Sequence, residues 1–138
     1  MELHKNAKIE LIKQVPLFSR CSKRELAAVA AEADELVMPE GRVLTKQGAR
    51  GSEFVVIVDG SADVNKNGRR INRLRSGDFL GEIALISGAP RTATVTTTSE
   101  TRILVLTDRA FKRLTRDMPS IQASVLKALS ERLQADAL

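Results

Sequence analysis

Glycine turns separate a series of short β-rich runs in the middle of the chain, and this pattern limits what residues 35–107 can form. The runs are too short for helices and too polar for membrane spans, and their spacing is typical of an antiparallel barrel or sandwich. The turn signals are Glu40-Gly41, Gln47-Gly48, Asp59-Gly60, Asn67-Gly68 and Ser76-Gly77. We expect strands near 35–38, 42–46, 54–58, 61–65, 70–74, 93–98 and 101–106. The pattern predicts an antiparallel, jelly-roll-like β-roll of about eight strands.

Helical signals flank this region on both sides. Ser22 and Glu25 form a capping box before an apolar helical stripe, and Asp108 can cap a helix that ends near Pro119. A last amphipathic helix is indicated by apolar residues four apart, at Ile121, Val125, Leu129 and Leu133. We predict one α+β domain over 1–138, with N-terminal helices in 1–34, the β-roll in 35–107 and two C-terminal helices in 108–138.

Composition excludes several classes of protein. The 138 residues suit one domain, and the single Cys21 and single His4 exclude an internal disulfide and leave no ligand set for zinc. Without Trp or Tyr the chain lacks the aromatic platforms on which single-stranded nucleic acids stack, so we expect no nucleic acid binding by this chain alone. The net charge of +5 fits an anionic partner.

Targeting signals are also absent from the sequence pattern. No apolar run approaches the length of a membrane span, and the N-terminus has mixed charge in place of an apolar signal core. A single free thiol fits a reducing compartment. We therefore predict a cytoplasmic protein without a membrane span, a metal or a resident cofactor.

The stretch 77–95 departs from the strand pattern. Good helix formers from Glu82 to Ile86 follow Gly81, and glycine and proline end the segment before Arg91. A helix start presents backbone N–H groups to an anion, and a guanidinium grips phosphate oxygens in a fork. The carboxylate of Glu82 suits a sugar hydroxyl, and Thr92 adds a hydroxyl for phosphate or a base edge. These groups together predict a site for a sugar phosphate.

The same stretch resembles the phosphate-binding cassette of the cyclic nucleotide-binding domain family. This family includes the catabolite activator protein and the regulatory subunits of cyclic-nucleotide-dependent kinases. The matching residues are Phe79, Gly81-Glu82-Ile83-Ala84-Leu85 and Arg91-Thr92-Ala93-Thr94-Val95. The similarity extends to the apolar elbow Val15-Pro16-Leu17-Phe18 and to Gly41 and Gly48. The chain looks like a stand-alone, bacterial-type member.

The resemblance implies roles for particular residues. Glu82 would accept a hydrogen bond from the ribose 2′-OH, and Arg91 would pair with the cyclic phosphate. Backbone N–H groups near Gly81 and of Ala93 would complete the cradle. The implied ligand-binding set is Gly81, Glu82, Ile83, Ala84, Arg91, Thr92 and Ala93, with Ile83 and Ala84 mostly packing the helix. In the family the last helix also covers the base; without Trp or Tyr that lid would be aliphatic or guanidinium, from Leu129, Arg132 and Leu133.

The implied function is a cyclic nucleotide sensor and not an enzyme. Ligand binding would change the position of the terminal helices, and cAMP is favoured over cGMP as the ligand. One alternative is a truncated regulatory part of a transcription factor, channel or enzyme, because 138 residues leave no room for a DNA-binding helix-turn-helix after the last helix. A cupin-type enzyme is the other alternative, and the sole histidine opposes it. The effector is unknown, and the last helix is a candidate homodimer seam.

Three further features have plain structural explanations. We interpret the cluster of cations from Lys66 to Arg75 as the solvated side of a hairpin rather than a phosphate-contacting stripe; its members are Lys66, Arg69, Arg70, Arg73 and Arg75. Cys21 has no neighbouring histidine or second cysteine, so a nucleophilic or redox role is not indicated. His4 is expected to be a solvated terminal residue.

Overall fold

The computed structural model describes residues 5–15, 18–51, 53–81, 90–123, 126–127 and 130. The chain divides into two compact units, one formed by Met1–Ala33 with Arg109–Leu138 and the other by Asp34–Asp108. The borders of the units fall within a residue or two of the borders predicted for the helical and β regions. Each unit is described by itself below.

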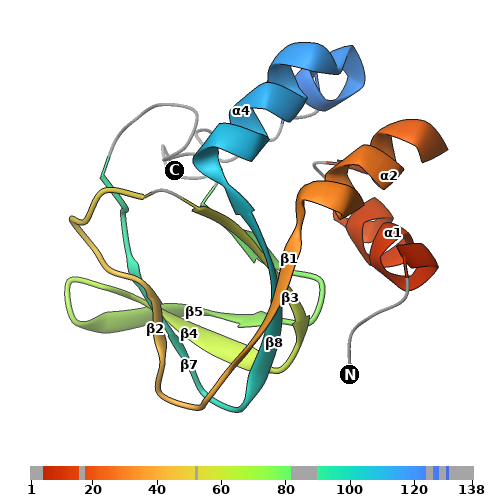
Figure 1. The fold of residues 1–138 in the computed structure, drawn as a ribbon. Coiled ribbons are helices and arrows are strands. Elements are labelled where there is room, and N and C mark those ends of the chain that lie inside the picture. Colours follow the sequence, from red (N-terminus) through yellow and green to blue (C-terminus); the bar gives the residue numbers. More distant parts are fainter. Residues whose placement is uncertain are drawn as a thin grey trace. The chain divides into compact units, whose positions relative to one another are not determined.

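Eight strands of the unit Asp34–Asp108 form two four-stranded antiparallel sheets among the described residues (Figure 1). The first sheet has the order β1-β8-β3-β6, with β1 at Asp34–Met38, β8 at Thr101–Thr107, β3 at Glu53–Asp59 and β6 at Phe79–Leu80. The second has the order β2-β7-β4-β5, with β2 at Val43–Thr45, β7 at Thr94–Thr97, β4 at Ser61–Lys66 and β5 at Arg69–Arg75. The predicted β-roll is confirmed.

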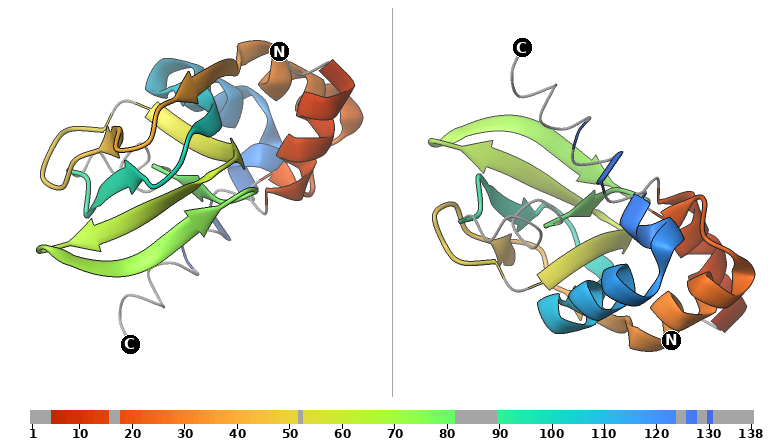
Figure 2. Two further views of the ribbon diagram at one scale, coloured as in Figure 1. Left: turned by 90° about the horizontal axis from the view of Figure 1, so that it is seen from below. Right: turned by 90° about the horizontal axis from the view of Figure 1, so that it is seen from above.

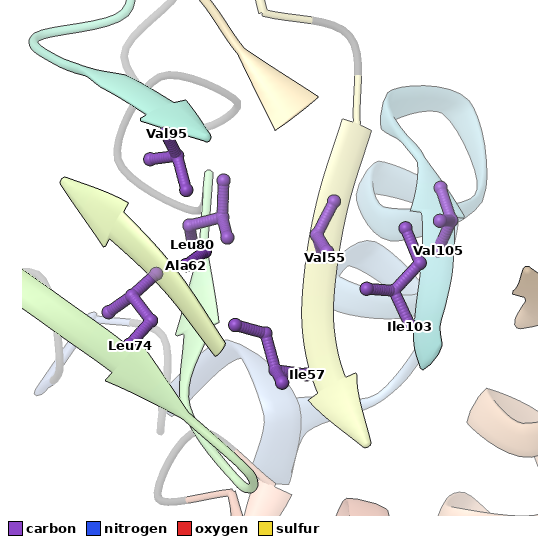
Figure 3. Close-up of a cluster of buried hydrophobic side chains, with 8 residues drawn as sticks. All are labelled: Val55, Ile57, Ala62, Leu74, Leu80, Val95, Ile103 and Val105. Atoms are coloured by element: carbon purple, nitrogen blue, oxygen red, sulfur yellow. The ribbon is translucent and has the colours of Figure 1, made fainter. Parts of the chain in front are cut away.

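Apolar side chains from both sheets meet inside the roll (Figure 3). Val55 and Ile57 come from β3, and Ile103 and Val105 come from the neighbouring β8. The second sheet and β6 complete the cluster with Ala62, Leu74, Leu80 and Val95. Because side chains alternate along a strand, each strand contributes every second residue to this core.

The residues between the core positions of β3 and β8 are buried as well. Phe54, Val56, Leu104 and Leu106 are each at most 3% exposed. Burial on both faces explains why these two strands read as continuous apolar runs in the sequence rather than as alternating ones. The ring of Phe54 also lies 5.8 Å from the ring of Phe79 at the start of β6, between centroids.

Local signals predicted the turns well, and one strand was missed. Asn67 and Gly68 both have positive φ, at 54° and 79°, which confirms the predicted type I′ hairpin between β4 and β5. The missed strand is β6, which pairs Phe79 with Val56 and Leu80 with Val55. Two residues are too few to show an alternating hydrophobic pattern in the sequence. This strand is therefore defined by its pairing with β3.

The helical unit contains α1 at Lys5–Gln14, α2 at Lys23–Glu32 and most of α4 at Asp108–Asp117, followed by helical residues 119–123. The predicted capping box of α2 is confirmed: Glu25 N donates to Ser22 Oγ at 3.1 Å, and Ser22 N donates to Glu25 Oε1 at 2.8 Å. Ile121 is fully buried as expected of the last helix. Val125, Leu129 and Leu133 of that helix, His4, and Pro16 and Leu17 of the elbow lie outside the described residues.

Two polar contacts join the helices of this unit. Arg113 Nη2 lies 2.6 Å from Glu32 Oε1, and the Ser120 hydroxyl donates to Glu25 Oε2 at 2.5 Å. The Ser120 hydroxyl, followed by the Ser22 backbone N–H, lowers the pKa of the Glu25 carboxyl. Burial raises the pKa of the nearby Cys21 thiol, which favours its protonated form.

We predict that Ser120→Ala raises the pKa of Glu25 toward its ordinary value. A carboxyl with a lowered folded-state pKa contributes stability above its unfolded-state pKa and loses it as pH falls through the folded value. The variant therefore shows a smaller loss of stability on acidification. NMR titration of the Glu25 carboxyl carbon measures the shift. Asp117, whose pKa is lowered by its hydrogen bond with Arg116, is the internal control and should not move. An unchanged Glu25 pKa would contradict the assignment.

Candidate functional site

Arg91 is the centre of the candidate site, and it is buried. It lies within the cassette, three residues before β7, and only 8% of its surface is exposed. Its backbone forms a two-way bridge with the loop between β2 and β3: Arg91 N donates to Ala49 O, and Gly48 N donates to Arg91 O, both at 2.9 Å. This bridge fixes the point from which the arginine side chain starts.

Two glycines leave room for the guanidinium. A Cβ added to Gly51 would overlap Nε and Cζ of Arg91 and would lie 2.8 Å from its Cδ. A Cβ added to Gly81 would overlap Nη1 of the same side chain and lie 2.5 Å from the carbonyl oxygen of Glu53. Gly81 also has a φ of +103°, which side-chain-bearing residues rarely adopt. The two glycine backbones therefore form the walls of a close-fitting cradle.

The carbonyl of Glu53, at the start of β3, completes this cradle. Nη2 of Arg91 donates a hydrogen bond to Glu53 O. β3 is the strand that also supplies Val55 and Ile57 to the core, so the acceptor belongs to a strand that is packed in the core. A guanidinium is planar and rigid, and a hydrogen bond at one edge fixes the direction of the remaining N–H groups.

The loop that contacts Arg91 is itself tied down. Gln47 N donates to Thr94 Oγ1 of β7 at 2.9 Å. The Gln47 side chain forms two hydrogen bonds with Asn67 at the tip of the β4–β5 hairpin: Nε2 donates to Asn67 Oδ1 at 2.8 Å, and Asn67 N donates to Oε1 at 2.9 Å. We call this pair the Gln47–Asn67 clasp. The loop thus has a defined position before any ligand arrives.

The structure brings together two of the residues predicted from the sequence, Gly81 and Arg91. Thr92 is exposed next to Arg91, and Ala93 is half-buried before β7. The other predicted ligand and lid residues lie outside the described residues; they are Glu82, Ile83, Ala84, Leu129, Arg132 and Leu133. Their roles stay predictions.

Sequence reasoning missed the contribution of the β2–β3 loop. Gly51 and the Glu53 carbonyl lie some forty residues before Arg91 in the chain, and neither was singled out. Gly51 has no strained φ and precedes no obvious turn, so only its contact with Arg91 explains why a side chain does not fit. The one available signal was a second glycine three residues after Gly48.

A buried guanidinium held by backbone groups is suited to bind an anion such as a phosphate. Among the residues that the structure describes, no three His, Cys, Asp or Glu side chains gather in a group that could hold a metal ion. Over the same residues, no helix is long and apolar enough to cross a membrane.

Comparison with known proteins identifies the family. The profile of the cyclic nucleotide-binding domain matches residues 35–117. This range includes the cassette, α4 and all strands of the roll; only Asp34, the first residue of β1, lies outside it. The chain belongs to the cyclic nucleotide-binding domain family. The fold and the Arg91 cassette had pointed to the same conclusion.

The similar proteins are regulatory subunits and channels. The chain is 37% identical over 114 residues to a cAMP-dependent protein kinase regulatory subunit of Mycosarcoma maydis, covering 76% of this chain and 22% of that protein. It is 32% identical over 123 residues to a cyclic nucleotide-gated potassium channel of Rhizobium etli, covering 89% and 34%. The regulatory domain of Toxoplasma gondii PKA, solved with cAMP, superposes with a TM-score of 0.79 at 27% identity, covering 92% and 50%. The chain thus spans about a quarter to a half of these relatives.

We predict that Gly51→Ala displaces the Arg91 guanidinium and weakens cyclic nucleotide binding roughly tenfold or more, because a loss of about 1.4 kcal/mol of binding free energy is a tenfold change. Gly41→Ala is the matched control. A Cβ at Gly41 meets nothing within 4 Å, but its φ of +83° strains any side chain, so this variant loses stability and keeps its affinity. Calorimetric titration and thermal unfolding separate the two effects. Equal affinities for Gly51→Ala and the wild type would refute the cradle.

Proposed function

We propose that this chain is a cAMP-binding regulatory module and has no catalytic activity of its own. The observation that carries the proposal is the buried Arg91, held at the end of the cassette by Gly51, Gly81 and the Glu53 carbonyl. A guanidinium in this setting offers directed N–H donors to a cyclic phosphate at little entropic cost on binding. The kinase regulatory subunits and the ion channel among its relatives support a regulatory role.

The remaining contacts follow from the cassette sequence. Glu82 would accept the ribose 2′-OH, and backbone N–H groups near Gly81 and of Ala93 would complete the phosphate cradle. Leu129, Arg132 and Leu133 would form an aliphatic or guanidinium lid over the base, because the chain has no Trp or Tyr to stack on it. Ligand binding would then shift the population of positions of the terminal helices.

The setting proposed for this module is the cytoplasm, with an effector protein or domain that responds to the ligand. A kinase, a channel or a transcription factor would each serve as an effector, since the chain spans only part of its relatives. A homodimer formed through the last helix is a second arrangement that would transmit the change. A cupin-type enzyme is disfavoured because one histidine cannot supply the metal ligands of that class.

The central test is removal of the Arg91 side chain. Arg91→Ala should weaken cAMP binding by about 2–5 kcal/mol, because a buried phosphate loses its partner. Glu82→Ala should cost about 1–3 kcal/mol, the scale of a hydrogen bond to a charged group. Isothermal titration calorimetry measures both affinities, and thermal unfolding verifies that each variant is folded.

Arg50→Ala is the matched control for this test, because Arg50 is an exposed arginine of the neighbouring loop. It should bind cAMP as the wild type does. If Arg91→Ala also kept wild-type affinity, the assignment of the site would be wrong. If the wild-type chain bound neither cAMP nor cGMP, the proposed function itself would fail.

Thr92 is the residue proposed to influence the choice of nucleotide. It resembles the position that bonds the guanine amino group in cGMP-preferring members of the family, and its exposure leaves the side chain accessible to a ligand. Thr92→Ala should therefore lower the affinity for cGMP more than that for cAMP. Parallel titrations with both nucleotides measure the ratio; an unchanged ratio would remove Thr92 from the selectivity argument.

A further inference from the structure

The β4–β5 hairpin concentrates positive charge within a unit whose basic and acidic residues balance as a whole. Basic and acidic residues are equally numerous over 34–108, but the stretch from Lys66 to Arg75 holds five cations and no carboxylate. All five side chains are exposed. The ligand site uses none of them, so the proposed function does not explain this cluster.

A β-bulge aligns the arginines of β5. Leu74 pairs with Ala62 and both are buried in the core, so Arg73 and Arg75 point to the outer face of the sheet. The register then shifts at Ile71, and Arg70 pairs with Asn65. Without this extra residue, Arg70 would face the core side, whereas the bulge returns it to the outer face.

The outer face of the sheet around the arginines of β5 is polar. Asp63 and Asn65 of β4 lie beside Thr96 and Thr94 of β7 in the register of the second sheet. Arg73 Nε contacts Asp63 Oδ1 at 2.9 Å, so a carboxylate is one partner that an arginine of β5 accepts on this face. Among the described residues, Lys66, Arg69, Arg70 and Arg75 form no such ion pair.

The hairpin is also held in place and its edge is partly closed. The Gln47–Asn67 clasp fixes the tip. β5 is the last strand of its sheet, but Arg73 N donates to Asn72 Oδ1 and Arg75 N donates to Asp78 Oδ2, both at 2.8 Å. These backbone donors are not offered to an added strand, so a partner would be held by side chains.

We propose that the outer face of β5 is a docking surface for an acidic, extended protein segment. Alternate residues of a strand lie about 7 Å apart, so carboxylates at alternate positions of such a segment match Arg73 and Arg75. Guanidinium forks favour carboxylates in paired geometry. Ile71, 59% exposed at the bulge, adds one apolar contact. A single exposed aliphatic residue is too little for insertion into a membrane, which favours a protein partner.

The probe is a labelled short peptide of alternating glutamate and threonine, measured by fluorescence anisotropy on the full chain. Binding should weaken on raising the salt concentration and should shift the amide signals of β5 in NMR spectra. A peptide with glutamine in place of glutamate should not bind. The double variant Arg70→Glu with Arg75→Glu should lose affinity for the acidic peptide by about tenfold or more.

Lys13→Glu with Lys23→Glu is the matched control, since both residues are exposed and the change of net charge is the same. It should keep most of the peptide affinity. Arg70→Gln with Arg75→Gln tests the surface without charge reversal if the first variant fails to fold, and should show a smaller loss. All folded variants should bind cAMP like the wild type, which separates this proposal from the proposed function.

Several outcomes would overturn the docking surface. If the acidic peptide does not bind the wild-type chain at low salt, the proposal fails. A control variant that loses as much affinity as the arginine variant would show a non-specific charge effect. Tighter binding of phosphatidylserine vesicles or duplex DNA than of the peptide, lost in the arginine variant, would assign the surface to a different class of partner.

Discussion

The burial of one guanidinium sets the requirements for the rest of the ligand-binding half of this molecule. A charged side chain that is 8% exposed is stable only if the fold supplies polar partners in fixed positions. The Glu53 carbonyl accepts from Arg91, and glycines stand at the two positions where a Cβ would overlap the guanidinium. The β2–β3 loop is bonded to the arginine backbone in both directions. Each of these features would be unnecessary if Arg91 pointed to solvent.

The core of the roll makes this arrangement rigid. β3 supplies the Glu53 carbonyl at its first residue and core side chains two and four residues later. β7 begins three residues after Arg91 and places Val95 in the same core (Figure 3). A site built on the ends of packed strands is positioned more accurately than one carried by loops alone. The hydrophobic cluster therefore fixes the position of the groups around Arg91 as well as stabilising the roll.

Features that depend on neighbouring residues in the chain could be predicted from the sequence, whereas features that depend on contacts between distant residues could not. Positive φ at Asn67 and Gly68 and the capping box of Ser22 with Glu25 depend on neighbours within a few residues, and all were predicted. The strand β6 and the role of Gly51 depend on residues far away in the chain, and both were missed. The role of Glu82, proposed from its carboxylate at the predicted helix start and from the family pattern, stays a prediction because Glu82 lies outside the described residues.

Arginines of the same β-roll serve different purposes because their surroundings differ. Arg91 is enclosed by backbone, so its N–H groups have one direction and little freedom to lose on binding. The arginines of β5 are exposed on the last strand of a sheet, and solvent screens each one. Figure 2 shows β5 and β4 as a long two-stranded hairpin. Affinity from such a surface would depend on several weak, screened contacts acting at once, whereas Arg91 would contribute one strong, directed contact to its site. In both places the backbone sets the direction of a guanidinium. The bulge at Ile71 places Arg70 on the outer face of the sheet, and Gly51 and Gly81 leave room for the side chain of Arg91.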